Sequence, residues 1–134
     1  MQYLALIYET AEARSKMSSA EGEAVFDEYR KLIAELGPKF IGGNRLHPPA
    51  AATTIRVRNN KRLVTDGPFA ETKEYLGGYF LIEAADLEEA ISIASRIPAA
   101  RMACVEVRPV VPREAPREQA APAQMQRASG AAQS

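Results

Sequence analysis

The spacing of apolar residues changes several times along this chain of 134 residues, and each spacing predicts one kind of secondary structure. Residues 3–8 form an unbroken apolar run rich in strand formers, which predicts a central, buried strand. Residues 75–82 predict a second strong strand, and the alternation over residues 104–107 predicts a strand at an edge of the sheet or at its end. A further strand is expected from Phe40, where Gly42-Gly43 indicates a bulge or a close approach of neighbouring backbone.

Two other segments carry apolar residues three or four positions apart, which is the spacing of a helix with one buried face. The first helix is expected to begin after Ser18 and to end at Gly37, and the second to run from Asp86 to Pro98. Both starts fit a capping box, in which the first side chain accepts a hydrogen bond from a backbone amide and a glutamate three residues later bonds back. The apolar stripe of the first helix would be Val25, Phe26, Tyr29, Leu32, Ile33 and Leu36, and that of the second Leu87, Ala90, Ile91, Ala94 and Ile97.

Residues 53–58 and 61–65 alternate with period two around Asn59-Asn60, which predicts a half-exposed hairpin with a tight turn. The complete order is strand, helix, strand, hairpin, strand, helix, strand. This order fits the ferredoxin-like split βαβ plan, an α+β fold with an antiparallel sheet and two helices on one face. Nothing in the sequence is left over to cover the other face, so we expect a homodimer that packs sheet against sheet around a cleft.

The composition changes from Val111 onward, where alanine, proline and glutamine dominate and no aromatic residue occurs. Such a segment cannot bury enough apolar surface to offset the entropy lost on ordering. We therefore expect one folded domain, residues 1–110, followed by a flexible tail, residues 111–134.

Composition also argues against several classes of function. The 17 basic and 17 acidic side chains balance, which disfavours a protein held to nucleic acid or to a membrane by charge alone. Four basic residues gather on the predicted hairpin, but without interleaved aromatic residues they are expected only to keep the hairpin soluble. No apolar run approaches the roughly 20 residues that cross a bilayer. Since Met1 is followed directly by a strand-like run rather than by a signal peptide, we expect a cytoplasmic protein.

The chain has one cysteine and one histidine, so it can form neither an internal disulfide nor a metal site built on several of these residues. Cys104 lies in an apolar strand and is expected to be a small buried hydrophobe rather than a nucleophile. No glycine pattern matches a phosphate-binding loop. We therefore expect neither a metal nor another cofactor.

The stretch of residues 63–81 contains the nine letters DGPFAETKE and closely resembles the signature of the DGPF branch of the YCII-related family. The opening MQYLALIY and the segments 52–58, 97–100 and 105–110 are similar to that family as well. The resemblance implies a dimeric ferredoxin-like α/β-barrel fold, in agreement with the pattern above. Some relatives are thought to be small-molecule enzymes that use a His-Asp pair, and others resemble accessory proteins of extracytoplasmic-function sigma factors.

The histidine of that pair belongs on the first helix, where alignment on Gly37 places Phe26 in this sequence, so the pair is absent. His47 lies elsewhere, after the second strand, and cannot simply take its place. His47 and Arg45 flank Leu46 and would point to the same face of an extended strand, where they could bind a carboxylate and move a proton. The alternative is a pair of exposed residues that enter a proline-rich loop.

Asp66 is the candidate general acid or base, because it follows a strand and precedes Gly67-Pro68, a turn that can hold a carboxylate at the end of the sheet. The alternative is that its carboxylate only caps the turn. Lys73 in the same motif is a candidate for binding an anionic group, or else belongs to a solvated face.

Gly77-Gly78 before Tyr79 has two interpretations. The small residues could open the floor of a pocket, with Tyr75 and Tyr79 as phenol donors on the same strand face. More often, glycines in a strand mark a bulge or let another element approach closely.

Two functions remain open at this point. The first is a homodimer that binds a small, anionic or aromatic metabolite near the DGPF motif, with cofactor-free acid/base chemistry at Asp66 and support from Arg45, His47, Lys73 and Tyr79. The second is a non-catalytic interaction module, such as an accessory of a sigma factor. The sequence does not decide whether the protein is an enzyme, and it names neither the ligand nor the partner.

Overall fold

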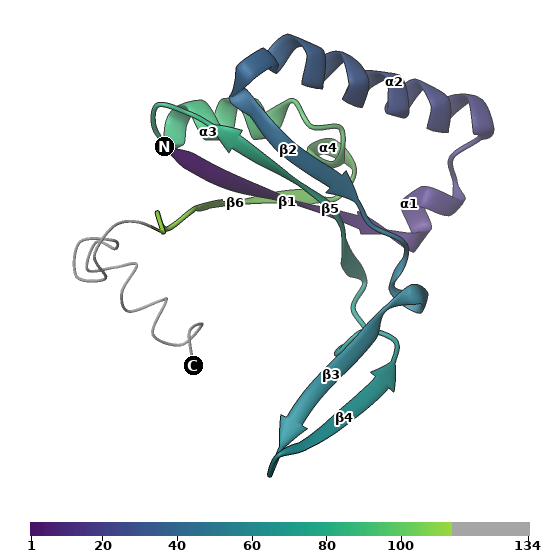
Figure 1. Ribbon diagram of the computed structural model, residues 1–134. Helices are drawn as coiled ribbons and strands as arrows, with labels where there is room; N and C mark the ends of the chain where they lie inside the picture. The colour runs from purple at the N-terminus through teal and green to yellow at the C-terminus, as the bar shows by residue number, and fades with distance from the viewer. Residues whose placement is uncertain (114–134) are drawn as a thin grey trace.

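A computed structural model describes residues 1–113, and it contains a four-stranded antiparallel sheet with helices on one face and a separate hairpin (Figure 1). The strands follow the order β2-β5-β1-β6, and β3 pairs only with β4. The longer elements are β1 (Gln2–Thr10), α2 (Ser19–Leu36), β2 (Phe40–Arg45), β3 (Thr53–Arg58), β4 (Lys61–Asp66), β5 (Glu74–Glu83), α3 (Leu87–Ser95) and β6 (Cys104–Pro109). The short helices are α1 (Ala11–Ser15), η1 (Gly37–Lys39), η2 (Pro49–Ala51) and α4 (Ala99–Met102).

This arrangement confirms the predicted α+β plan, with the first strand in the centre and the last strand at an edge. The capping box of α2 is complete, since Ser18 Oγ accepts from the amide of Glu21 and the Glu21 carboxylate accepts from the amide of Ser18. At α3 only half of the box forms: Asp86 accepts from the amide of Glu89, whose own carboxylate bonds to Ala85 and pairs with a lysine.

The core lies between the sheet and the helices. Side chains of β1 and β5 that point to the helical face meet the C-terminal half of α2 and the inner face of α3; the buried set includes Tyr3, Ala5, Ile7, Leu32, Leu36, Phe80, Ile82, Ala90, Ile93 and Ile97. The predicted stripe of the second helix is partly wrong, because Leu87 and Ile91 are exposed and Ile93 is buried instead. The buried positions Ala90, Ile93, Ala94 and Ile97 follow the spacing i, i+3, i+4, i+7, and this set excludes Leu87 and Ile91.

The predicted tight turn of the hairpin is confirmed, because Asn59 and Asn60 both have positive φ, as a two-residue hairpin turn requires. Both strands are fully exposed rather than half-exposed, apart from Thr54. The hairpin runs away from the sheet on the side opposite the helices, so no described element covers either of its faces (Figure 1). The predicted flexible tail falls almost entirely on residues 114–134, which lie outside the described residues.

One glycine in β2 is required by the packing of the sheet. A Cβ added at Gly43 would lie 2.5 Å from the backbone oxygen of Tyr79 and also within contact of the Phe80 ring. The neighbouring Gly42 has no heavy atom within 4 Å of the same added atom.

We expect Gly43→Ala to lower the free energy of unfolding by about 1 to 3 kcal/mol, because the new methyl group forces backbone to move. Gly42→Ala is the matched control and should change it by less than about 0.5 kcal/mol. Urea unfolding of both variants provides the measurement. An equal effect of the two substitutions would contradict this account of Gly43.

Candidate functional site

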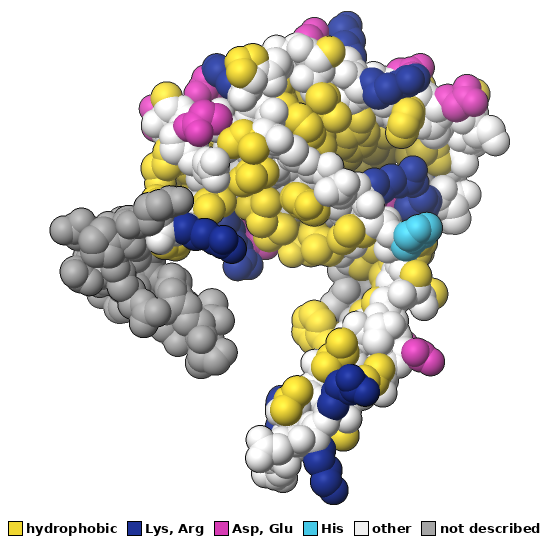
Figure 2. Space-filling view, in the orientation of Figure 1, with side chains coloured by type: hydrophobic (Ala, Val, Ile, Leu, Met, Phe, Trp, Pro, Cys, Tyr) yellow, Lys and Arg dark blue, Asp and Glu magenta, His cyan; other side chains and the backbone are white. Residues whose placement is uncertain are grey.

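A cavity of about 730 Å³ opens between the N-terminal half of α2 and one end of the sheet. Figure 2 shows hydrophobic side chains in the hollow beneath α2. The residues around it come from β1, α1, α2, β2, β5 and α4, so segments far apart in the sequence meet there. Such a volume suits a small organic molecule rather than a single ion.

The cavity exists because α2 packs on the sheet with only its C-terminal half. Leu32 and Leu36 are buried, whereas Phe26, nearer the start of the helix, is 51% exposed and lines the cavity. The prediction of one continuously buried stripe is therefore wrong for the first half of this helix. The sheet below that half presents Gly43, Gly77 and Gly78, which have no side chains to fill the space.

The glycines of β5 form part of the cavity floor. The pairing of β1 with β5 shifts at this point: Ile7 pairs with Gly78 and Tyr8 with Leu76, which leaves Gly77 as an extra, bulged residue. A Cβ added at Gly77 would collide with the carboxylate of Glu9. The glycines fit both interpretations: Gly77 is the bulged residue, Gly78 lies where the backbone of β2 approaches closely, and both also line the floor of the cavity.

The charged residues that line the cavity are Glu9, Arg14, Glu23, Arg30 and Arg45, and they differ in their partners. The Glu9 carboxylate pairs with Arg14 at 2.9 Å. Arg30 pairs with Asp27 at 2.5 Å and lies over the ring of Phe26, 5.0 Å from its centroid. Arg45 makes no ion pair with any residue in the described range 1–113.

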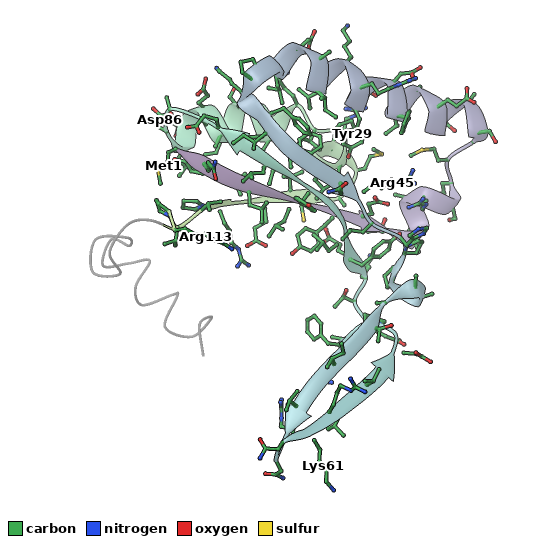
Figure 3. All side chains as sticks on the ribbon, in the orientation of Figure 1. Met1, Tyr29, Arg45, Lys61, Asp86 and Arg113 are labelled. Carbon is green, nitrogen blue, oxygen red and sulfur yellow. The ribbon has the colours of Figure 1, made fainter. Side chains whose placement is uncertain are left out.

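Tyr29 supplies a neutral hydrogen-bond donor inside the cavity. Figure 3 labels Tyr29 and Arg45, and both lie between α2 and the sheet. Burial, followed by the negative charge of Glu9, raises the pKa of the Tyr29 phenol, the amide of Ala99 and the charge of Arg45 oppose the shift, and the net result is a change from 10.0 to about 12. The phenol therefore keeps its proton throughout the neutral range.

The structure brings only one of the five predicted site residues to this cavity. Arg45 lines it, whereas Asp66, Lys73 and His47 are exposed and lie outside its lining. Within residues 1–113, the side chains of Asp66 and His47 make no hydrogen bond or ion pair, with each other or with a third residue. Their proposed pairing in one cleft therefore stays a prediction.

Tyr79 lies on the opposite face of the sheet, since its neighbour Phe80 is buried under the helices. Its hydroxyl accepts a hydrogen bond of 2.9 Å from the Asn44 side chain. The expectation that Tyr75 shares this face is wrong. Tyr75 pairs with Glu9 and Tyr79 with Leu6, and positions three apart on β1 point to opposite faces.

Cys104 is exposed, which corrects the expectation of a buried hydrophobe. It begins the edge strand β6 on the sheet face that no described helix covers. Its thiol donates to the Glu74 carboxylate at 3.2 Å. This hydrogen bond, followed by partial burial, raises the pKa of the thiol, so Cys104 is not an activated nucleophile.

Residues 1–113 contain no group of three or more His, Cys, Asp or Glu side chains arranged to hold a metal ion. Within the same range, no helix is long and apolar enough to cross a membrane.

The fold places the chain in the α+β class, and comparison with known proteins defines it further. Residues 1–114 match the YCII-related domain, and the protein belongs to the YCII-related family. An uncharacterized protein of Rhizobium meliloti (strain 1021) is 38% identical over 118 residues, a match that covers 82% of this chain and 92% of the relative.

A solved structure of 5-chloro-2-hydroxyhydroquinone dehydrochlorinase from Burkholderia phenoliruptrix AC1100, in complex with 2,5-dihydroxybenzoquinone, also matches. Its TM-score is 0.41 at 16% sequence identity, over 82% of this chain and 93% of that chain. At this similarity, no residue role is transferred from that enzyme.

Sequence reasoning missed Glu9 and Tyr29 as cavity residues. The helical spacing places Tyr29 on the apolar stripe, and its partial burial agrees with that position, but spacing alone does not show that the first half of the helix stands away from the sheet. Glu9 did carry a signal: it is a charged residue that continues the strand pattern of residues 3–8.

The raised pKa of Tyr29 makes stability depend on pH in alkaline solution. In the unfolded chain the phenol ionises near pH 10, and in the folded chain near pH 12, so folding favours the protonated form. This contribution is complete below about pH 10 and is lost as the pH rises toward 12. We expect wild-type stability to fall more steeply than that of Tyr29→Phe over this window, as measured by urea unfolding at several pH values. Parallel curves for the two proteins would contradict the assignment.

Proposed function

We propose that this protein binds a small organic anion with a flat, apolar body in the cavity beneath α2. The observation that carries the proposal is the position of Arg45, a guanidinium without a carboxylate partner in the described chain, at the edge of an apolar cavity. A bound carboxylate or phenolate would supply the missing partner through a charge-assisted hydrogen bond. The aromatic rings of Phe26 and Tyr29 would contact its apolar body.

The same cavity holds the groups needed for proton transfer without a cofactor. The Glu9 carboxylate can accept a proton, and the Tyr29 phenol, which stays protonated at neutral pH, can donate a hydrogen bond to the developing negative charge. Phe26, which stands where some relatives carry the histidine of their His-Asp pair, lines this cavity too. We therefore locate the small-molecule site beneath α2 rather than at the DGPF loop, residues 66–69.

We further propose that the protein works as a homodimer. The sheet face opposite the helices carries apolar side chains, including Leu4, Leu6, Leu76 and Leu81, and no described element covers it. A two-fold dimer needs one surface that is complementary to itself, and a flat sheet face meets this condition.

A pair of nearly isosteric probes tests the site. We expect wild type to bind 2-naphthoate at least tenfold more tightly than the neutral 2-naphthamide, because only the carboxylate can pair with Arg45. Arg45→Gln should remove this preference while leaving the affinity for the amide nearly unchanged. Isothermal titration with both probes gives the four dissociation constants.

Arg96→Gln is the matched control, because Arg96 pairs with Glu35 and does not line the cavity. It should keep the preference of the wild type. Loss of the preference in both variants would point to a general charge effect and contradict the role of Arg45. Failure of wild type to bind either probe would contradict the cavity as an aromatic-anion site and favour the interaction-module alternative.

Asp66→Asn and His47→Gln separate this site from the one predicted at the DGPF loop. We expect both variants to bind 2-naphthoate as wild type does, since neither residue lines the cavity. The same titrations measure the outcome. A loss of binding in Asp66→Asn, with circular dichroism unchanged, would instead place the site at the DGPF loop.

A further inference from the structure

Within residues 1–113, the β3–β4 hairpin, residues 53–66, pairs with no strand of the main sheet, and none of its residues belongs to the buried core. It forms its own two-stranded sheet, and Figure 1 shows it extending from the body, with Lys61 near its tip in Figure 3. Every residue of its two strands is exposed except Thr54. An isolated two-stranded hairpin is at best marginally stable in water, so a hairpin of this length is expected to gain its stability from another surface.

One face of the hairpin has the composition of a contact surface. Ile55 pairs directly with Val64, and Val57 lies two residues further along the same strand, so the three side chains share one face. They are 61%, 55% and 60% exposed, respectively. Arg62, which pairs with Val57, lies on this face as well, whereas Leu63 is the one apolar side chain of the two strands on the other face.

The hairpin also lies on the same side of the sheet as the uncovered apolar face. The helices occupy one side, and the hairpin extends to the other, so the two surfaces border a common space (Figure 1, Figure 2). A body that filled this space would contact both the sheet face and the hairpin.

The distribution of charge along the chain indicates which molecule would fill this space. The hairpin carries four basic side chains and one acidic one, Arg56, Arg58, Lys61, Arg62 and Asp66. Because the whole chain has 17 of each sign, the remainder has 13 basic against 16 acidic residues. A positively charged hairpin is thus complementary in charge to the rest of a second copy of the same chain.

We propose that the hairpin is an arm that grips a second copy of this chain, with the face of Ile55, Val57 and Val64 packed against the partner. The proposal rests on the homodimer proposed above and adds the element that stabilises it. In a two-fold dimer each copy gives one arm and receives one, so every arm is covered.

The double substitution Ile55→Ser/Val64→Ser tests the arm, and Leu63→Ser on its other face is the matched control. Sedimentation velocity over a range of concentrations gives the dissociation constant of each dimer. We expect the double variant to weaken the dimer at least tenfold and the control to weaken it less than threefold. Because the hairpin is separate from the core, circular dichroism of the body should be unchanged in both.

A second measurement locates the arm directly. In a Cys104→Ser background, a nitroxide attached at Arg58→Cys is mixed with unlabelled, ¹⁵N-enriched chain. Broadening of amide signals in the enriched chain shows that the arm lies against the other copy, and its absence overturns the proposal.

The outcomes also separate the two proposals. If the wild type is monomeric at every concentration, both the homodimer and the arm are contradicted. The hairpin would then be a contact surface for a different protein, such as a sigma factor. If the wild type is dimeric and the double variant dissociates no more readily than Leu63→Ser, only the arm is contradicted.

Discussion

The absence of a side chain at Gly77 is the constraint on which the geometry of the site depends. Because β5 contains one residue more than β1 can pair with at this point, the strand bulges and exchanges the faces of the residues before it. Glu9 can then occupy the space where a Cβ of residue 77 would lie. The place of the Glu9 carboxylate, the open floor of the cavity and the location of Tyr75 and Tyr79 on opposite faces of the sheet all depend on this position.

The two halves of α2, the helix above the bulge, have different roles: one packs in the core and the other covers the cavity. Its C-terminal half contributes Leu32 and Leu36 to the core and is fixed by them, while the capping box at Ser18 sets where the N-terminal half begins. The roof of the cavity is therefore anchored by apolar packing at its C-terminal end. Such an arrangement lets the protein keep an apolar hollow without weakening the core beside it.

The amino-acid sequence predicted the fold well because each element has a local cause. The apolar period predicts the strands and helices, Ser18 and Asp86 start the two helices, and Asn59-Asn60 accepts the left-handed turn of the hairpin. The candidate site was predicted less well. Arg45 was identified, but the cavity arises from the angle of α2 to the sheet and from a one-residue shift of register, and neither is visible in a local pattern.

The errors have the same origin. Cys104 and the two hairpin strands have the apolar alternation of covered strands, yet no element within residues 1–113 covers them. Alternation predicts that a face is suited to burial, and only the tertiary arrangement decides whether the same chain buries it. A sequence that patterns a surface for contact and then leaves it open in the monomer is informative about assembly.

The separation of the hairpin from the main sheet has a consequence for amide hydrogen exchange. The hydrogen bonds of β3 and β4 belong to a ladder that shares no strand with the core, so they can open without global unfolding. Their amides would exchange quickly in a chain by itself and slowly in a chain whose hairpin is covered. If the hairpin is the arm proposed above, the exchange rate of this segment, relative to that of β1 and β5, reports how much of the protein is associated at a given concentration.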